Sequence, residues 1–268
     1  MEMSSREQLI PVRKFIRNAK RFGNVPRVAD SAGIKLSGRR LLLASLAMRR
    51  VLLRKVVQPG EQNIGVLLPP SVGGAIANMS LALMGKTTVN LNYTLSDDVL
   101  NVCIHKAGIT HVLTSRKFIE KKPFAVEGAE LVFLEDLKEQ ITSLDKAISA
   151  VQGVVCPTVL LERMLGLHRI GRDDTLTIVF TSGSTGEPKG VVLSHRNVGA
   201  NLEAIDSLLQ LTEVDGILGV LPFFHSFGFT ACMWLPMCYA VRGVYHFNPL
   251  DARIVGRLVQ EHKLTILM

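Results

Sequence analysis

Short apolar runs, rich in β-branched residues, return along the first half of the chain at intervals of about twenty residues. Between them lie segments whose apolar residues recur with helical spacing. Strands that alternate with helices form βαβ units, so the pattern predicts an α/β protein with mostly parallel sheets flanked by helices. The predicted strands are residues 63–68, 87–91, 110–114 and 131–134, and the predicted helices between them are residues 71–84 and 96–106.

Two segments outside this alternation have patterns of their own. An amphipathic helix is predicted from Ser37 onward, with Ser37 as its N-cap, an exposed basic face, and Pro59 and Gly60 ending the segment. Residues 151–173 follow no clear period, and they are assigned to a strand, a short helix and a loop.

The longest apolar stretch is residues 217–241, which Pro222, His225, Gly228 and Pro236 interrupt. These interruptions favour buried core over a membrane span. The first thirty residues carry charges throughout and have no apolar signal segment, so we expect a cytoplasmic protein.

Composition supports a folded protein and excludes some kinds of site. With 47% hydrophobic and 20% charged residues among 268, the chain is expected to bury a large core. Its four cysteines include no C-x-x-C pair and its seven histidines show no metal-ligand spacing, so neither a disulfide framework nor a zinc site is predicted. No nucleic-acid partner is expected.

The net charge of +8 is concentrated at the N-terminus, because residues 1–55 hold 14 Lys and Arg against three acids. Basic residues there alternate with Leu9, Ile10, Val12, Phe15 and Ile16. Such a segment suits an anionic lipid surface, which would make the protein peripheral to the inner membrane, or an acidic partner protein. The alternative is a solvated leader with a few packed apolar residues.

The stretch LTIVFTSGSTGEPKGVVLSH, residues 176–195, has the pattern of a strand, a loop and a second strand. Strands are predicted at 175–180 and 191–193, and a helix is predicted from Ser194 or His195 to about Leu209. The loop between the strands combines glycines, hydroxyls and a lysine, which together suit a polyphosphate. Pro188 excludes the G-x-x-x-x-G-K-[ST] loop, and no G-x-G-x-x-G occurs here. A plain surface hairpin would need neither four adjacent hydroxyls nor the lysine.

TSGSTGEPKGVVLSH resembles the phosphate-binding signature of the adenylate-forming (AMP-binding) enzymes, the superfamily of acyl-CoA synthetases, luciferases and peptide-synthetase adenylation domains. LPFFHSFGFT, residues 221–230, resembles the family segment whose histidine and aromatic residues line the acyl-binding tunnel. VLTSRKFIE, VFLEDLK and the ending FNPLDARIVGRLVQEHKLTILM resemble the acyl-acyl-carrier-protein synthetase half of bifunctional acylglycerophosphoethanolamine acyltransferase/synthetases.

The resemblance implies roles for particular residues. Thr181, Lys189 and His225 are the implied catalytic residues, and His225, Phe227 and Gly228 the implied substrate-binding residues, with the helix 228–239 walling a tunnel. The residues implied to bind the ATP phosphates are Thr181, Ser182, Gly183, Ser184, Thr185, Gly186 and Lys189.

The same resemblance implies an ATP- and Mg²⁺-dependent ligase for long-chain fatty acids, which passes the acyl group to CoA or to the phosphopantetheine of acyl carrier protein. A synthetase with CoA as its sole acceptor is the alternative. Residues 58–205 would form one sheet-and-helix layer, with 1–57 and 206–268 in a second, incomplete layer. Because the family's C-terminal lid and its catalytic lysine are absent, the chain is expected to be an inactive front fragment that self-associates, or a non-catalytic binding fragment.

Overall fold

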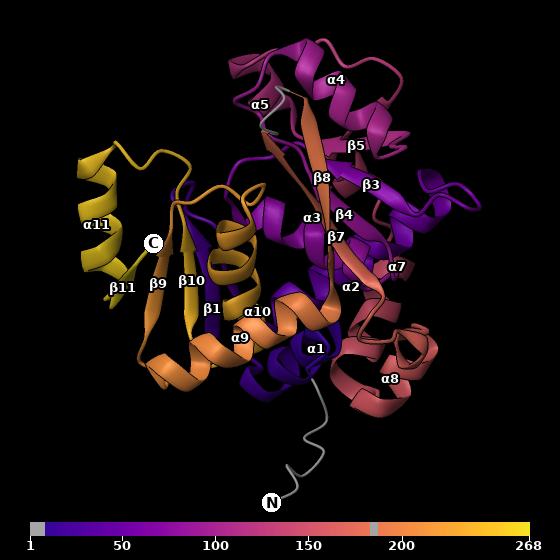
Figure 1. The fold of residues 1–268 in the computed structure, drawn as a ribbon. Coiled ribbons are helices and arrows are strands. Elements are labelled where there is room, and N and C mark those ends of the chain that lie inside the picture. Colours follow the sequence, from indigo (N-terminus) through magenta and orange to yellow (C-terminus); the bar gives the residue numbers. More distant parts are fainter. Residues whose placement is uncertain (1–8, 183–186) are drawn as a thin grey trace, which may run out of the picture.

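Two β-sheets organise the chain in the computed structural model, which describes residues 9–182 and 187–268 (Figure 1). The six-stranded sheet has the order β6-β5-β3-β4-β7-β8, and its neighbours are parallel except for β7 and β8. The strands predicted in the first half of the chain are confirmed. The strands of this sheet are β3 (Asn63–Val66), β4 (Thr87–Asn90), β5 (His111–Thr114), β6 (Glu130–Phe133), β7 (Thr175–Ser182) and β8 (Pro188–Ser194).

The five-stranded sheet joins the two ends of the chain. Its order is β11-β9-β10-β1-β2, with β2 antiparallel to β1 and the other neighbours parallel. An early strand, β1, therefore pairs with the late strand β10. The strands are β1 (Pro26–Asp30), β2 (Lys35–Ser37), β9 (Gly216–Gly219), β10 (Arg242–Tyr245) and β11 (Ile266–Leu267).

Helices lie between and around the sheets, as the α/β pattern predicted (Figure 1). Two predicted helix starts are confirmed by their caps, because the Ser37 hydroxyl accepts a hydrogen bond from Arg40 N and the Ser194 hydroxyl accepts one from Asn197 N. The α-helices are α1 (Pro11–Phe22), α2 (Gly38–Lys55), α3 (Val72–Ala82), α4 (Asp97–Lys106), α5 (Arg116–Lys121), α6 (Leu134–Glu139), α7 (Ser143–Ala150), α8 (Thr158–Met164), α9 (His195–Leu209), α10 (Leu235–Cys238) and α11 (Ala252–His262). Two π-helices, η1 (Val151–Val155) and η3 (Gly228–Trp234), and one 3₁₀ turn, η2 (Leu167–Arg169), complete the set.

Helix α3 lies between the two sheets and is bonded to both. At its first turn, Val72 N donates to the carboxylate of Asp30, the last residue of β1 in the five-stranded sheet. In its middle, the Asn78 amide exchanges hydrogen bonds of 2.8 and 3.1 Å with the amide of Asn90, the last residue of β4 in the six-stranded sheet. None of its residues is exposed, which explains why the sequence of α3 is apolar or small on every face.

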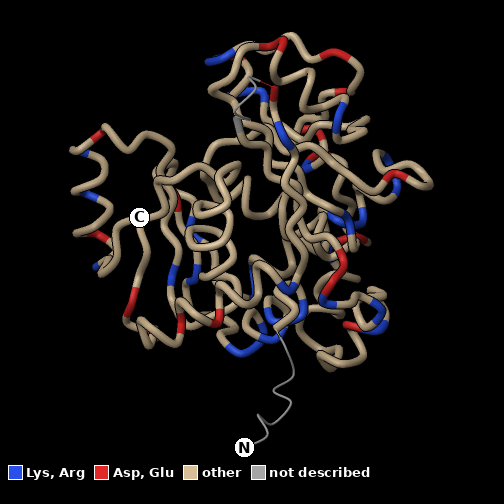
Figure 2. Tube along the Cα trace, viewed as in Figure 1, with Lys and Arg blue, Asp and Glu red and all other residues tan. Residues whose placement is uncertain are grey.

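For the N-terminal apolar residues, the structure favours the alternative of packed side chains over a lipid-facing surface. Val12, Phe15 and Ile16 are at most 1% exposed, because α1 packs its apolar face against α2 and α10. They belong to the main core and cannot face lipid. Figure 2 shows Lys and Arg along α1, but several of these side chains hold neighbouring parts of the chain.

Residues 151–173 also differ from the prediction, because no strand occurs among them: η1 continues α7, and α8 and η2 follow. The valines there have strand propensity, but tertiary packing overrides it. Gly153 lies so close to α2 that an added Cβ would be 2.4 Å from Leu43 Cδ2. At Gly153, η1 therefore packs directly against α2, more than a hundred residues earlier in the chain.

The apolar stretch 217–241 forms β9, a loop, η3 and α10, and all of it except residues 225–227 of the loop is buried or partly buried. Within the two described ranges, no helix combines the length and apolar character needed to cross a membrane. The expectation that this stretch is buried core is confirmed for η3 and α10, whose residues are all buried.

Candidate functional site

The predicted phosphate-binding sequence lies at the tip of an antiparallel hairpin formed by β7 and β8. Thr181 pairs with Lys189 at its end, and both residues are exposed. The implied phosphate ligands Gly183, Ser184, Thr185 and Gly186 lie outside the described residues. The hairpin therefore brings Thr181 and Lys189, which are separated by seven residues, to opposite positions on two strands.

Strand β7 is attached to the centre of the six-stranded sheet. The buried Thr177 hydroxyl donates a 2.7 Å hydrogen bond to the Thr88 carbonyl of β4, and the two strands run parallel. The end of β7 that carries Thr181 therefore lies at the carboxyl edge of this sheet. In open α/β sheets, ligands bind outside this edge.

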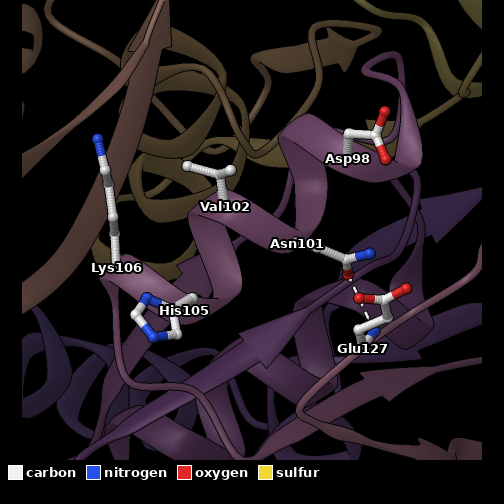
Figure 3. Close-up of a pocket in the computed structure, with 6 residues that line it drawn as sticks. All are labelled: Asp98, Asn101, Val102, His105, Lys106 and Glu127. Atoms are coloured by element: carbon white, nitrogen blue, oxygen red, sulfur yellow. Dashed lines mark hydrogen bonds between the residues drawn. The ribbon is translucent and has the colours of Figure 1, made fainter.

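Lys106, the last residue of α4, contacts the loop end of the same hairpin. Its ammonium group donates to Glu187 Oε2 at 2.8 Å and to the Pro188 carbonyl at 3.3 Å. The hydrogen bond from Lys106 lowers the pKa of Glu187. Lys106 and Glu127 line opposite sides of a surface depression of 350 Å³ that runs along α4 (Figure 3). Sequence reasoning missed Lys106, and no local signal marked it, because its partner is 81 residues away.

The second motif follows β9 at the carboxyl edge of the five-stranded sheet. Phe223 and Phe224 are buried, whereas His225 is exposed and Phe227 is 54% exposed. The His225 ring lies 4.6 Å from the Phe224 ring, centroid to centroid. The loop thus anchors itself through two phenylalanines and presents His225 and Phe227 to solvent.

An aromatic contact joins the carboxyl edges of the two sheets. Tyr93, three residues beyond β4, packs edge-on against Phe224 with 4.9 Å between ring centroids. Burial raises the pKa of Tyr93, and its buried hydroxyl has no hydrogen-bond partner among the described residues. Tyr93 was absent from the predicted site, although an aromatic residue just beyond a predicted strand was the available signal. Through this contact the His225 loop lies beside the sheet edge that carries Thr181.

Gly228 begins η3 and has a physical reason to be glycine. An added Cβ would lie 2.1 Å from the Pro222 carbonyl oxygen, so the close approach is to the chain's own backbone. The side chains of η3 and α10 pack against α1, α9 and β9, which accounts for their apolar character as core. Phe227 is therefore the outward-facing aromatic residue of this motif.

His195 follows the hairpin as the first residue of α9. Burial lowers its pKa to about 4, so its imidazole is neutral at physiological pH. Its Nδ1 atom is buried without a hydrogen-bond partner in the described part of the chain. The described residues contain no group of three or more His, Cys, Asp or Glu side chains able to hold a metal ion.

Comparisons with known proteins match nearly the whole chain. The family model described as AMP-binding enzyme matches residues 15–268. The 2-succinylbenzoate–CoA ligase of Bacillus licheniformis is 31% identical over 203 residues, which is 75% of this chain and 37% of that protein. The long-chain-fatty-acid–CoA ligase of Bacillus subtilis is 23% identical over 269 residues, covering 90% of this chain and 47% of that protein.

A solved structure shows the same fold. The o-succinylbenzoate coenzyme A synthetase of Bacillus subtilis, in complex with ATP and magnesium ion, superposes with a TM-score of 0.75 at 20% identity. The match covers 94% of this chain and 62% of that one. The chain thus spans less than half the length of the two ligases and under two thirds of the solved synthetase.

Proposed function

Because the chain belongs to the AMP-binding enzyme family, we propose that it is the front part of an ATP-dependent ligase for long-chain fatty acids. The fatty-acid carboxylate oxygen attacks the α-phosphorus of ATP, and the bond to pyrophosphate breaks, which leaves an acyl-adenylate. A thiolate then attacks the acyl carbonyl carbon, and AMP leaves as the thioester forms.

One observation carries this proposal: the signature hairpin and the His225 loop lie at the carboxyl edges of two sheets that touch through Tyr93 and Phe224. The edge at Thr181 offers a hydroxyl and the Lys189 cation, which suit phosphate oxygens. The edge at the His225 loop offers the exposed aromatic Phe227, which suits an acyl chain. A nucleotide and a fatty acid could then meet between the two.

Lys189 and Thr181 are assigned to the leaving pyrophosphate. Charge develops on that group as the bond to the α-phosphorus breaks, and fixed donors aimed at it lower the barrier. Lys189 is exposed and opposite Thr181, so both can approach one phosphate. The described residues supply no metal-binding cluster of their own, so we assign no step to Mg²⁺.

The thiol acceptor is proposed to be CoA or the phosphopantetheine of acyl carrier protein. The two relatives described above are CoA ligases, which supports CoA. A basic N-terminal segment would favour the acidic acyl carrier protein. Two of its arginines, Arg13 and Arg17, instead pair with Glu162 of the chain itself, which weakens the support for acyl carrier protein. A comparison of CoA with holo-acyl carrier protein as acceptors, at low and high salt, tests this point, since attraction to an acidic carrier weakens with salt.

The central test replaces Lys189 by Ala in this chain and measures the affinity for ATP with magnesium by calorimetry. The loss of a charged hydrogen bond to phosphate should weaken binding at least about tenfold. Lys138→Ala, at an exposed position on α6, is the matched control and should bind as the parent does. Equal affinity of all three proteins, at unchanged melting temperature, would place the phosphates elsewhere.

The second candidate function is that of a fragment that binds ligands without catalysis. It is supported by the length of the chain, which spans less than half the length of each of the two relatives. Catalysis needs all groups held in position, so a partial site loses orders of magnitude in rate. We expect this polypeptide to bind ATP but to show no fatty-acid-dependent pyrophosphate exchange, and the longer protein to show it. Exchange by the polypeptide alone would contradict the fragment assignment.

A further inference from the structure

An unusual concentration of exposed apolar side chains lies on α7, η1 and α8. Of the twenty large hydrophobic residues exposed in the described part of the chain, seven fall between residues 144 and 164, and each is 48–74% exposed. Scattered exposed hydrophobics are ordinary, whereas a group of this kind marks an interaction surface. The members of this group, hereafter the helical patch, are Leu144, Val151, Val154, Val155, Val159, Leu160 and Met164.

The exposed charges within the patch segment, residues 143–169, are of one sign. Its segment contains two acids, Asp145 and Glu162, and both are buried, at 1% and 3% exposure. The exposed charged side chains between residues 143 and 169 are Lys146, Arg163 and Arg169. Within residues 143–169, a partner therefore meets apolar groups and positive charge, and exposed carboxylates occur only outside the segment, the nearest in sequence being Glu139 and Asp173.

The two acids are neutralised from inside the fold. Asp145 accepts hydrogen bonds from Arg50 and Arg54 of α2, and the bond from Arg54 is the main reason that its pKa lies far below the ordinary value. Glu162 is paired with Arg13 and Arg17 of α1, at 3.3 and 3.0 Å. Both carboxylates thus attach the patch segment to the core and leave its outer surface cationic.

Contacts with the core hold the backbone of the helical patch in place. Lys20 of α1 donates to the Gln152 carbonyl at 3.3 Å and also bonds the Cys156 carbonyl. Leu161 is fully buried in the main core, next to the exposed Leu160. The apolar side chains on the outside are therefore fixed in place while they face solvent.

We propose that the helical patch docks this protein onto an anionic membrane surface. Apolar side chains enter the boundary between headgroups and acyl chains, and neighbouring cations attract anionic headgroups. The surface offers both features together, and the absence of an exposed acid from residues 143–169 removes the repulsion that such headgroups would meet. This inference goes beyond the proposed ligase activity and does not depend on it.

The test is sedimentation of the whole chain with vesicles, without ATP or fatty acid. The chain should bind vesicles made of equal parts phosphatidylcholine and phosphatidylglycerol more tightly than vesicles of phosphatidylcholine alone. The double variant Val155→Ser with Val159→Ser should bind at least about tenfold less tightly, since each buried carbon is worth about fourfold. Its matched control, Leu208→Ser with Leu250→Ser, changes two highly exposed leucines outside the patch and should bind as the parent does.

The charge component has a separate pair of variants. Lys146→Glu with Arg163→Glu should abolish the preference for anionic vesicles, because each cation near such a surface contributes about fivefold. Lys117→Glu, an exposed position on α5, should not change it. Vesicle binding that is equal for patch and control variants, or absent in the parent chain, would overturn the proposal. Self-association that the Val155 and Val159 changes abolish, without vesicle binding, would replace the membrane by a second copy of the chain.

Discussion

His195 should make the stability of this protein fall as the solution is acidified. Its pKa is about 4 in the folded chain and 6.5 in an ordinary environment, with burial as the cause and Asp174 partly opposing it. Below pH 6.5 the unfolded chain takes up a proton that the folded chain refuses, so protons favour unfolding. This contribution to stability is complete above pH 6.5, and it is lost as the pH falls towards 4.

The magnitude follows from the two pKa values. A pKa difference of about 2.5, at about 1.4 kcal/mol for each tenfold change, corresponds to about 3 kcal/mol lost between pH 6.5 and pH 4. The single tryptophan, Trp234, is 1% exposed, so its fluorescence can follow denaturant unfolding across this range. His246 and His262 also have pKa values lowered by burial, so the total loss will exceed the share of His195.

The informative quantity is therefore the difference between the parent chain and His195→Gln, which cannot take up the proton. The parent should lose about 3 kcal/mol more than the variant over this interval, whatever their relative stability at pH 7. Parallel curves of unfolding free energy against pH would refute the reasoning. They would mean that His195 has the same pKa in both states, and that water reaches its ring in the folded protein.

Four further outcomes are expected. Asp145→Asn should lower the free energy of unfolding by about 1–3 kcal/mol, because the buried side chain loses its charge-assisted hydrogen bonds from Arg50 and Arg54. The exposed Asp98→Asn should change it by under about 0.5 kcal/mol, and similar losses for the two variants would contradict this. Gly228→Ala should destabilise by about 1–3 kcal/mol through overpacking. Phe227→Ala should mainly reduce pyrophosphate exchange with long fatty acids in the longer protein, and an equal reduction for all chain lengths would argue against a tunnel there. A thiol reagent should modify Cys156 first, because the other three cysteines are buried and burial raises their pKa values; rapid reaction of more than one thiol would show that the core opens.

The elements that sequence predicted best are those whose signals are local. Ser37 is predicted and observed as a helix cap, and Ser194, predicted with His195 as a helix start, is observed as one, since a cap depends on a hydroxyl and an amide three residues apart. The strands of the six-stranded sheet follow from their own apolar runs. The sequence also predicted that the phosphate-binding signature lies between two strands, because the strand and loop patterns occur within twenty residues.

What sequence could not provide depends on contacts between distant residues. The basic residues of α1 suggested an external anion, but Arg17 meets Glu162, which is 145 residues away. The valines of residues 151–155 suggested a strand, but they form the π-helix η1, in which Gly153 packs closely against α2. The contact of Tyr93 with Phe224 joins two motifs whose separation along the chain gives no hint of their contact.

Helix α3 has a consequence for how the molecule opens. Its first turn is bonded to the end of β1 and its middle to the end of β4, so neither sheet can separate from α3 without breaking buried hydrogen bonds. An opening that exposes α3 to solvent must break its buried hydrogen bonds to both sheets. The amide hydrogens of α3 should therefore exchange with deuterium only through global unfolding, and the two layers should melt in a single cooperative transition.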